Sequence, residues 1–340
     1  MTPPWNPLSW KPLSWKPLSW STAPQELTPW GHALNAAGLR GDRLRADYTA
    51  AAGMAFRRYP LWYVPTRLFM PAASQPYLLT VIAFGLHGDN LADVPAHERD
   101  PEPLYTWNEQ VRKGLRTGQA EQPFLRAFLH TVATRELPHS DVHTILAGQA
   151  QQSAYTEYPT EEDYDEHIER INMPLTRLIH QVVLPGTPQP PTPAARAHAE
   201  AIQRTDDLAD LAKDLRHSGK LTLPLTDLAR FGVTRSDLES ARDTRAVRAL
   251  LAHACHKARS AQAAAEQALS PLGPECELLY RPGLLFQHQV MNTVERRGAS
   301  LTRHPVSLPL HLSPGHLVGG ALRVLHGRLR AATSMGVQTR

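Results

Sequence analysis

The chain has 340 residues, of which 42% are hydrophobic, and its 36 basic and 32 acidic side chains give a formal net charge of +4. This hydrophobic content excludes disorder of the whole chain and allows one large core. Charges of both signs are interspersed, so no basic block indicates a nucleic-acid partner. The two cysteines form no CxxC pair, and neither a zinc cage nor a disulfide framework is predicted.

The N-terminal residues 1–24 contain the proline-rich repeat WNPLSW-KPLSW-KPLSW, which suits neither a helix nor a central strand. We expect a disordered tail there. Its indole rings and lysines are compatible with peripheral contact at a membrane surface. Because no run of 18 apolar residues and no signal-peptide pattern is present, the predicted compartment is the cytoplasm.

From about residue 25, helix-length segments alternate with short breaks that contain Pro or Gly, and period-2 strands are missing. An all-α fold is therefore predicted. Residues 25–310 form the expected helical domain, and residues 311–340 form an expected C-terminal extension with a helix.

The first half of this domain contains two clear helical patterns. Residues 77–93 begin with YLLTVIAFGL, which is apolar on every side and predicts a helix buried in a large bundle. Residues 124–137 predict a helix with a one-sided apolar stripe, made of Phe124, Leu125, Phe128, Leu129 and Val132.

The second half begins after a proline-rich loop at residues 185–193. Thr192 and Pro193 are the predicted N-cap and first residue of a long helix, because no Gly or Pro follows until Gly219. Residues 234–270 also lack Gly and Pro and predict one or two further helices.

Two pairs of aspartates have the form D-x-x-x-D: Asp89 with Asp93, and Asp210 with Asp214. On a helix such a pair shares one face, with side chains about 6 Å apart. Carboxylate oxygens at this spacing suit hard divalent cations. The first pair closes a helix that is too apolar to be a solvated face.

On the second helix, projection at 100° per residue places four side chains in one sector beside the apolar stripe: Gln203, Asp207, Asp210 and Asp214. A row of carboxylates at the edge of the core needs bound cations or basic partners. The alternative from spacing alone is a pair of solvated acidic faces that pair with Arg204, Lys213 and Arg216.

The segment DLAKDLRHSGKLTLPLTDLARFGVTRSDL, which begins at Asp210, resembles the signature of the squalene/phytoene synthase family. It contains an aspartate motif, a basic Gly-containing loop, a Leu-Pro and a leucine-rich segment that ends in Arg-Phe-Gly-Val. Upstream, residues 203–206 stand where the family has Q-x-x-N, and residues 59–71 and then 89–93 follow the order of its first half. The resemblance spans residues 59–238, with weaker support from residues 277–298.

Several positions depart from the family pattern. The G-x-x-x-D of the middle region is here Gly148 followed by Gln152, and the nearby Arg-Tyr pair is Glu157-Tyr158. Asp206 replaces the Asn of Q-x-x-N. With Pro174 as the anchor of the next segment, a histidine takes the place of the family's tyrosine, which makes His167 the candidate catalytic residue.

The resemblance implies an isoprenoid synthase helical bundle around a central apolar cavity and a Mg²⁺-dependent prenyltransferase, with Mn²⁺ as the alternative ion. The implied partner is a prenyl diphosphate, farnesyl or geranylgeranyl diphosphate. The candidate metal ligands are Asp89, Asp93, Asp206, Asp210 and Asp214. The candidate substrate-binding residues are Arg67, Gln203, Arg216 and Lys220.

The expected reaction is ionisation of a prenyl diphosphate followed by head-to-head condensation with a second one. Two alternatives stay open on the same fold, a single-substrate terpene synthase and a non-catalytic lipid-binding relative. No dinucleotide fingerprint follows a strand in the sequence, so use of NADPH is not supported.

Overall fold

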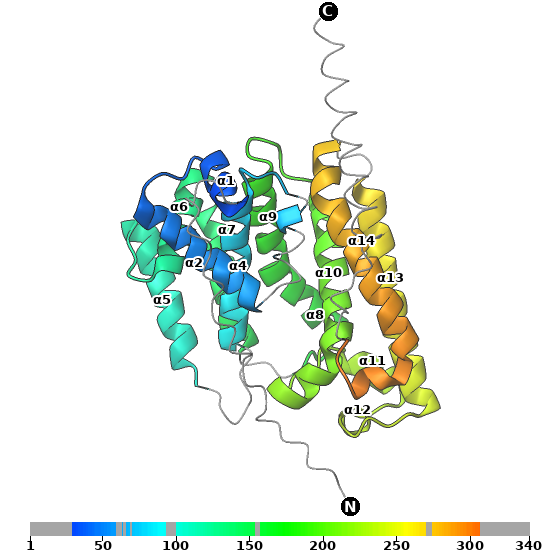
Figure 1. Cartoon of the computed structure of the whole chain (residues 1–340). Coiled ribbons are helices and arrows are strands. Elements are labelled where there is room, and N and C mark those ends of the chain that lie inside the picture. The colour runs from blue at the N-terminus through cyan, green and yellow to red at the C-terminus, as the bar shows by residue number, and fades with distance from the viewer. Residues whose placement is uncertain are drawn as a thin grey trace, which may run out of the picture.

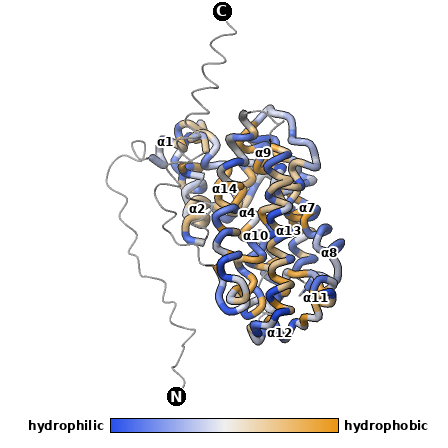
Figure 2. Tube along the Cα trace, turned by 90° about the vertical axis from the view of Figure 1, so that its right-hand side faces the viewer, coloured by the Kyte–Doolittle hydropathy of each residue, from blue (hydrophilic) through white to orange (hydrophobic). Residues whose placement is uncertain are grey.

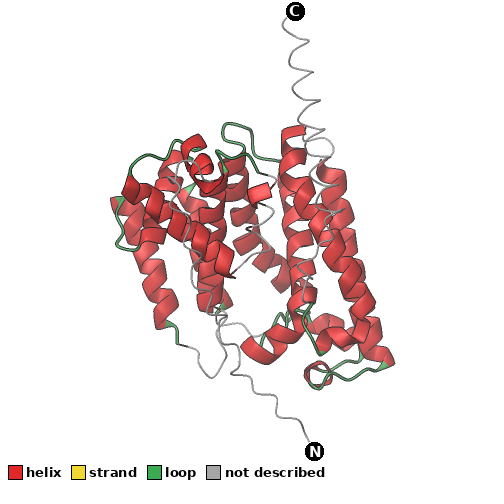
Figure 3. Ribbon diagram, in the orientation of Figure 1, coloured by secondary structure: helices red, strands yellow, loops and turns green. Residues whose placement is uncertain are grey.

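A computed structural model describes residues 29–58, 63, 66–68, 70–92, 100–153, 157–269 and 274–306. Every regular element in these ranges is a helix, and Figure 3 draws no strand among them. Strand-like pairing is confined there to one bridge between Glu157 and Leu221. The predicted all-α fold is confirmed. The expected tail, residues 1–24, and the expected extension, residues 311–340, lie outside the described residues.

The helices carry the labels of Figure 1. The first half of the chain forms α1 (Pro29–Ala36), α2 (Asp42–Arg58), α4 (Gln75–Ala92), α5 (Glu102–Thr117), α6 (Pro123–Thr134) and α7 (His139–Gln152). The second half forms α8 (Glu161–His167), η3 (Ile168–Asn172), α9 (Met173–Val183), α10 (Thr192–Lys213), η4 (Asp214–Ser218), α11 (Leu225–Phe231), α12 (Arg235–Glu239), α13 (Arg245–Leu269), α14 (Pro274–Arg297) and η6 (Gly298–Thr302). Of these, η3 and η4 are π-helices and η6 is a 3₁₀ helix.

These helices form two groups in Figure 1. Helices α2, α4, α5, α6 and α7 lie on one side, and α10, α13 and α14 lie on the other. Helix α9 contacts both α4 and α10 and so joins the groups. Figure 2 shows hydrophobic and hydrophilic residues alternating along the helices, as expected where each helix turns one face to the interior.

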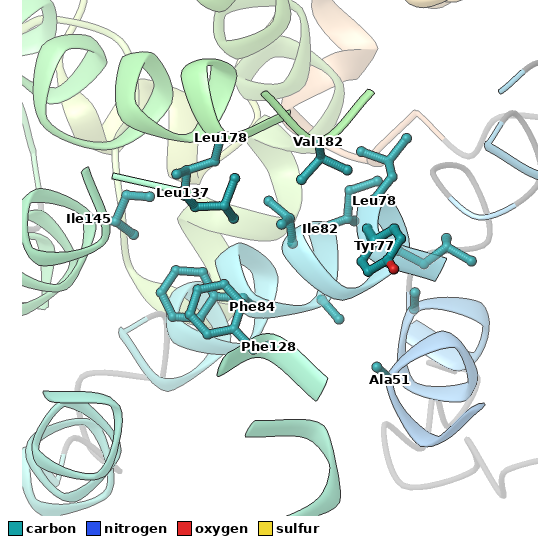
Figure 4. Packing of buried hydrophobic residues seen from close by; sticks show 14 of the residues in the cluster. Ala51, Tyr77, Leu78, Ile82, Phe84, Phe128, Leu137, Ile145, Leu178 and Val182 are labelled. Carbon is teal, nitrogen blue, oxygen red and sulfur yellow. The ribbon is translucent and has the colours of Figure 1, made fainter. Parts of the chain in front are cut away.

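Helix α4 lies in the middle of the larger core and is buried through most of its length, as its apolar sequence predicts. Its Phe84 stacks on Phe128 of α6, with ring centroids 4.0 Å apart, and Tyr77 and Ile82 pack in the same cluster (Figure 4). All five residues of the stripe predicted on α6 are buried. That helix ends at Thr134, earlier than predicted, because the chain turns at Glu136 with a φ of 52°.

Helix α10 begins at Thr192, and its N-cap is Pro191. The prediction of Thr192 as the N-cap is therefore wrong by one residue, and no side chain caps this helix. Its first turn contains Pro193. Backbone N–H groups in the first turn have no partner within the helix, so the proline costs no hydrogen bond there. The helix continues to Lys213, widens into the π-helix η4 and stops at Gly219, the predicted end.

Residues 234–270 contain two helices, in agreement with the prediction. The short helix α12 precedes the 25-residue α13. Thr234 caps α12 through a capping box with Asp237. Buried alanines on α13, such as Ala258 and Ala261, let it pack closely along α10. No helix in the described ranges is both long and apolar enough to cross a bilayer.

Candidate active site

Asp89 lies in the last turn of α4 and is held by a buried side chain of α7. Nε2 of Gln149 donates to Oδ1 of Asp89 over 3.0 Å and to the carbonyl oxygen of Gly85, also over 3.0 Å. Gln149 has no exposed surface. The second aspartate of this motif, Asp93, lies outside the described residues.

The second acidic motif lies at the C-terminal end of α10. Asp206, Asp210 and Asp214 follow one another at intervals of four residues, and Asp210 forms a 2.7 Å ion pair with Lys213. Burial lowers the pKa of Lys213, but the Asp210 hydrogen bond and the charges of all three aspartates raise it overall. All three carboxylates therefore lie close enough to Lys213 to raise its pKa.

The ion pair between Lys213 and Asp210 is one of the contacts expected if basic residues, rather than bound cations, neutralise the aspartates of α10. The other two basic residues have different partners. Arg204 forms ion pairs with Glu161 and Glu200, and Arg216 donates to the carbonyl oxygen of Thr302 over 2.8 Å. Lys213 is thus a basic residue that pairs with the second acidic motif, whereas Arg204 binds glutamates and Arg216 binds a backbone carbonyl.

Lys220 and His167 approach the same end of the bundle. Nζ of the buried Lys220 donates to the carbonyl oxygen of Ala92, the last residue of α4, over 3.5 Å. His167, the last residue of α8, packs its ring against Tyr158 with centroids 5.6 Å apart. Burial and the Lys220 charge lower the pKa of His167 to about 4, so its imidazole is neutral at pH 7.

Lys220 reaches this position because of the loop after η4. Gly219 has a φ of 65°, a left-handed conformation that ends the helix and reverses the chain toward α4. Leu221 then pairs with Glu157, whose carboxylate receives Nη1 of Arg235 over 3.3 Å. The Glu157 position that departs from the family pattern therefore helps to hold the loop that carries Lys220.

A chain of hydrogen bonds runs beside Asp206, Asp210 and Asp214, and its bond between Tyr164 and Asp207 is buried. The Tyr164 hydroxyl donates to Oδ2 of Asp207 over 2.7 Å, and Nε2 of Gln203 donates to Oδ1 of Asp207 over 2.9 Å. Nδ2 of Asn172, on η3, donates to Oε1 of Gln203 over 2.8 Å. Burial raises the pKa of Asp207 to about 7, against the opposing effect of the Tyr164 hydrogen bond.

The side chains of two predicted substrate-binding arginines bind elsewhere. Arg67 donates to Gln75 at the start of α4 and lies over the ring of Trp30, 5.2 Å from its centroid. Asp89 is 14 residues further along α4, which corresponds to roughly 21 Å at 1.5 Å per residue. Arg216 binds backbone carbonyls at the end of η6. The structure thus groups Gln203, Lys220 and His167 with the aspartates, but neither arginine.

The donor set at this end suits magnesium. Its acidic side chains supply the hard oxygen ligands that Mg²⁺ prefers. In the described part of the chain, no three His, Cys, Asp or Glu side chains gather closely enough to form a metal site by themselves. Proteins commonly hold Mg²⁺ through one or two carboxylates together with substrate phosphates, and pairs of aspartates on two helix ends fit that arrangement.

Sequence reasoning missed four members of the site: Tyr164, Gln149, Asn172 and, as a candidate, Asp207. The helical projection did place Asp207 in the row, but the Q-x-x-N resemblance selected its neighbour Asp206. A Gln on an otherwise apolar helix face predicts a buried hydrogen bond, because a buried amide needs a partner. The partner itself, 60 residues away in the case of Gln149 and Asp89, follows no local pattern.

Comparison with known proteins identifies the family of this chain. The family model for squalene/phytoene synthase matches residues 63–312. The phytoene synthase of Arthrospira platensis is 25% identical over 250 residues, which cover 69% of this chain and 79% of that protein. The 15-cis-phytoene synthase of Synechocystis is 24% identical over 255 residues, which cover 71% of this chain and 75% of that protein.

Solved structures give the same result. The squalene synthase HpnC from Alicyclobacillus acidocaldarius superposes with a TM-score of 0.66 at 25% identity and covers 78% of this chain and 98% of its own. A dehydrosqualene synthase, at 17% identity, shares the fold with a TM-score of 0.69 and covers 89% of this chain and 100% of its own. The chain belongs to the squalene/phytoene synthase family, a family of prenyltransferases with an all-helical terpenoid synthase fold.

Proposed function

We propose that this protein ionises a prenyl diphosphate in a Mg²⁺-dependent step and condenses it head to head with a second one. One observation carries the proposal: the 3.5 Å contact between Lys220 and Ala92 brings the loop that follows the α10 motif to the end of the α4 motif. Acidic residues of both motifs and a buried cation therefore meet at one end of the bundle. This is the composition that a leaving diphosphate needs.

The aspartates of the two motifs are the proposed holders of Mg²⁺, with Mn²⁺ as the alternative ion. They are Asp89, Asp206, Asp210 and Asp214, together with Asp93, whose position lies outside the described residues. Bound there, the ion supplies neutralisation of the diphosphate charge. Lys220 contributes a further positive charge from a buried position. Gln203 is the proposed residue for orienting substrate, and its hydrogen bonds with Asn172 and Asp207 support this role.

His167 is the proposed proton acceptor. Because its pKa is lowered to about 4, the ring is a neutral base at pH 7 and does not add positive charge beside an allylic cation.

The substrate chain, farnesyl or geranylgeranyl, would extend along the apolar faces of α4 and α9. Apolar surroundings exclude water, which would otherwise quench the cation. Location in the cytoplasm, with peripheral contact to a membrane, stays a prediction.

A single-substrate terpene synthase is the second candidate. The departures at Gln152 and Glu157 favour it, because the family's Asp and Arg are absent there and Glu157 pairs with Arg235 instead. Such an enzyme would keep the ionisation step and lose the second substrate.

The test uses purified protein with Mg²⁺ and, separately, geranyl, farnesyl and geranylgeranyl diphosphate. Diphosphate release is followed, and extracted products are analysed by mass spectrometry. We expect a product with twice the carbon number of the substrate. Asp89→Asn and Asp210→Asn are expected to lower the rate at least about 100-fold, since each removes a metal ligand. Asp243→Asn, whose carboxylate pairs with Arg248 on α13, is the control.

A product of unchanged carbon number would replace head-to-head condensation by the terpene synthase reaction. Absence of diphosphate release with every substrate would contradict both catalytic functions and leave the non-catalytic lipid-binding relative.

A further inference from the structure

Gln149 of α7 is a fully buried amide in direct contact with the first aspartate motif. Its Nε2 faces two acceptors, the carbonyl oxygen of Gly85 and Oδ1 of Asp89, each at 3.0 Å. The carbonyl oxygen of Gly85 can only accept, so the amide nitrogen has to face it. The opposite orientation would bring Oε1 against two other oxygens. The amide therefore has one allowed orientation.

This orientation leaves Oε1 of Gln149 buried without a hydrogen-bond donor. An unpaired buried acceptor costs about 1–3 kcal/mol of stability. A methionine of similar volume would fill the same space without that cost. A methionine would, however, remove the two hydrogen bonds that Nε2 donates. What a glutamine provides at this position is a donor to Asp89.

The surface of α4 is shaped to receive this amide. A Cβ atom on Gly88 would lie 2.1 Å from Oε1 of Gln149 and 2.4 Å from its Cδ. The amide consequently rests directly on the backbone of α4, one residue before Asp89. Gly148, the neighbour of Gln149, allows a similar approach on the other side, because a Cβ there would lie 2.7 Å from Cγ1 of Ile171 on η3. Glycines on both helices thus bring α7, α4 and η3 close together around Gln149.

We propose that Gln149 is a positioning residue that fixes the Asp89 carboxylate for Mg²⁺. The inference rests on the proposed function. Carboxylate ligands that are held by a hydrogen bond from a neighbouring group bind metal more tightly, and loss of the neighbour typically weakens metal binding 10–100-fold. Gln149 has the position and the donor for this role.

The test compares Gln149→Met with a matched control, Gln262→Met. Gln262, on α13, is equally buried, and its Nε2 donates to Oγ1 of Thr205 over 3.1 Å, on the side of α10 that faces α13. Two quantities are measured: the Mg²⁺ concentration for half-maximal diphosphate release, and the rise in melting temperature that Mg²⁺ produces with inorganic diphosphate. The second needs no turnover.

For Gln149→Met we expect a Mg²⁺ requirement raised at least about tenfold in both measurements, with kcat recovering at saturating Mg²⁺. Gln262→Met is expected to keep the wild-type requirement even if its melting temperature falls. An unchanged requirement in Gln149→Met, or an equal shift in both variants, overturns the inference. A wild-type protein that shows neither diphosphate release nor stabilisation by Mg²⁺ with diphosphate contradicts the proposed function itself.

Discussion

At Gly88 the missing side chain decides where Gln149 lies, and through Gln149 how Asp89 is held. The glycine is helical, so its φ requires no special freedom, and only the space above it matters. The same reasoning applies to Asp207, whose two oxygens accept from Tyr164 and Gln203. Single atoms rather than helix propensities set the geometry at both aspartates.

Gly88→Ala therefore tests the contact directly. The added methyl group overlaps the Gln149 amide, which is fully buried and cannot move into solvent. We therefore expect a loss of about 1–3 kcal/mol in the free energy of unfolding. Chemical denaturation measures it. In the double variant with Gln149→Ala the overlap is gone, so the combined loss should be smaller than the sum of the single losses. Additive losses would show that the two side chains do not share this space.

At the scale of the element, the end of α10 is unusual because the helix widens before it stops. The π-helix η4 begins at Asp214, the last aspartate of the row, and closes at Gly219. π-Helical turns occur often at functional sites because they shift side chains relative to the regular helix. A second one, η3, contains Asn172, the partner of Gln203. Both irregular turns thus contribute residues to the candidate site.

Gly219 and Gly232 allow a matched test of this element. Their φ angles are 65° and 64°, and a Cβ at either would meet nothing within 4 Å. Substitution by alanine should cost both variants about 1–2 kcal/mol of backbone strain, measured by urea denaturation. Only Gly219→Ala should also lower the rate of diphosphate release, because Lys220 follows it. Equal rates in the two variants would remove Lys220 from the site.

At the scale of the whole molecule, α9, α10 and α14 meet around Tyr280. The ring of His198 on α10 packs on Tyr280 with centroids 4.5 Å apart, and Nδ1 of His180 on α9 lies 3.1 Å from the Tyr280 hydroxyl. Burial lowers the pKa of His198 to about 4. A proton on this ring would place a charge between three packed helices.

The stability of the molecule should therefore depend on pH through His198. In the unfolded chain the ring titrates near pH 6.5, and in the fold near 4, so its contribution is complete above pH 6.5 and is lost as the pH falls toward 4. Between pH 7 and 4.5 the loss is on the order of 2–3 kcal/mol. We expect His198→Phe to lose less stability than the wild type over this interval, by chemical denaturation at each pH. Identical slopes would exclude the effect.

Much of the fold could be predicted because its signals are local. The apolar run that became α4, the stripe on α6 and the uninterrupted segment ending at Gly219 depend on neighbours within a few turns. The one-residue error at Thr192 and the early end of α6 at Glu136 are boundary effects, where backbone angles outweigh propensity. The π-helical turn at Asp214 had no local signal.

The sequence by itself determined the all-α class, the family and the spacing of the aspartates, because helical periodicity and a contiguous signature lie in consecutive residues. Only the tertiary structure decided which side chains meet. It placed Arg67 at the opposite end of α4 from Asp89 and turned Arg216 toward η6. It also joined Gln149 to Asp89 and Asn172 to Gln203. Such pairs depend on how helices pack across the bundle, and packing is set by the shapes of whole faces rather than by any one segment.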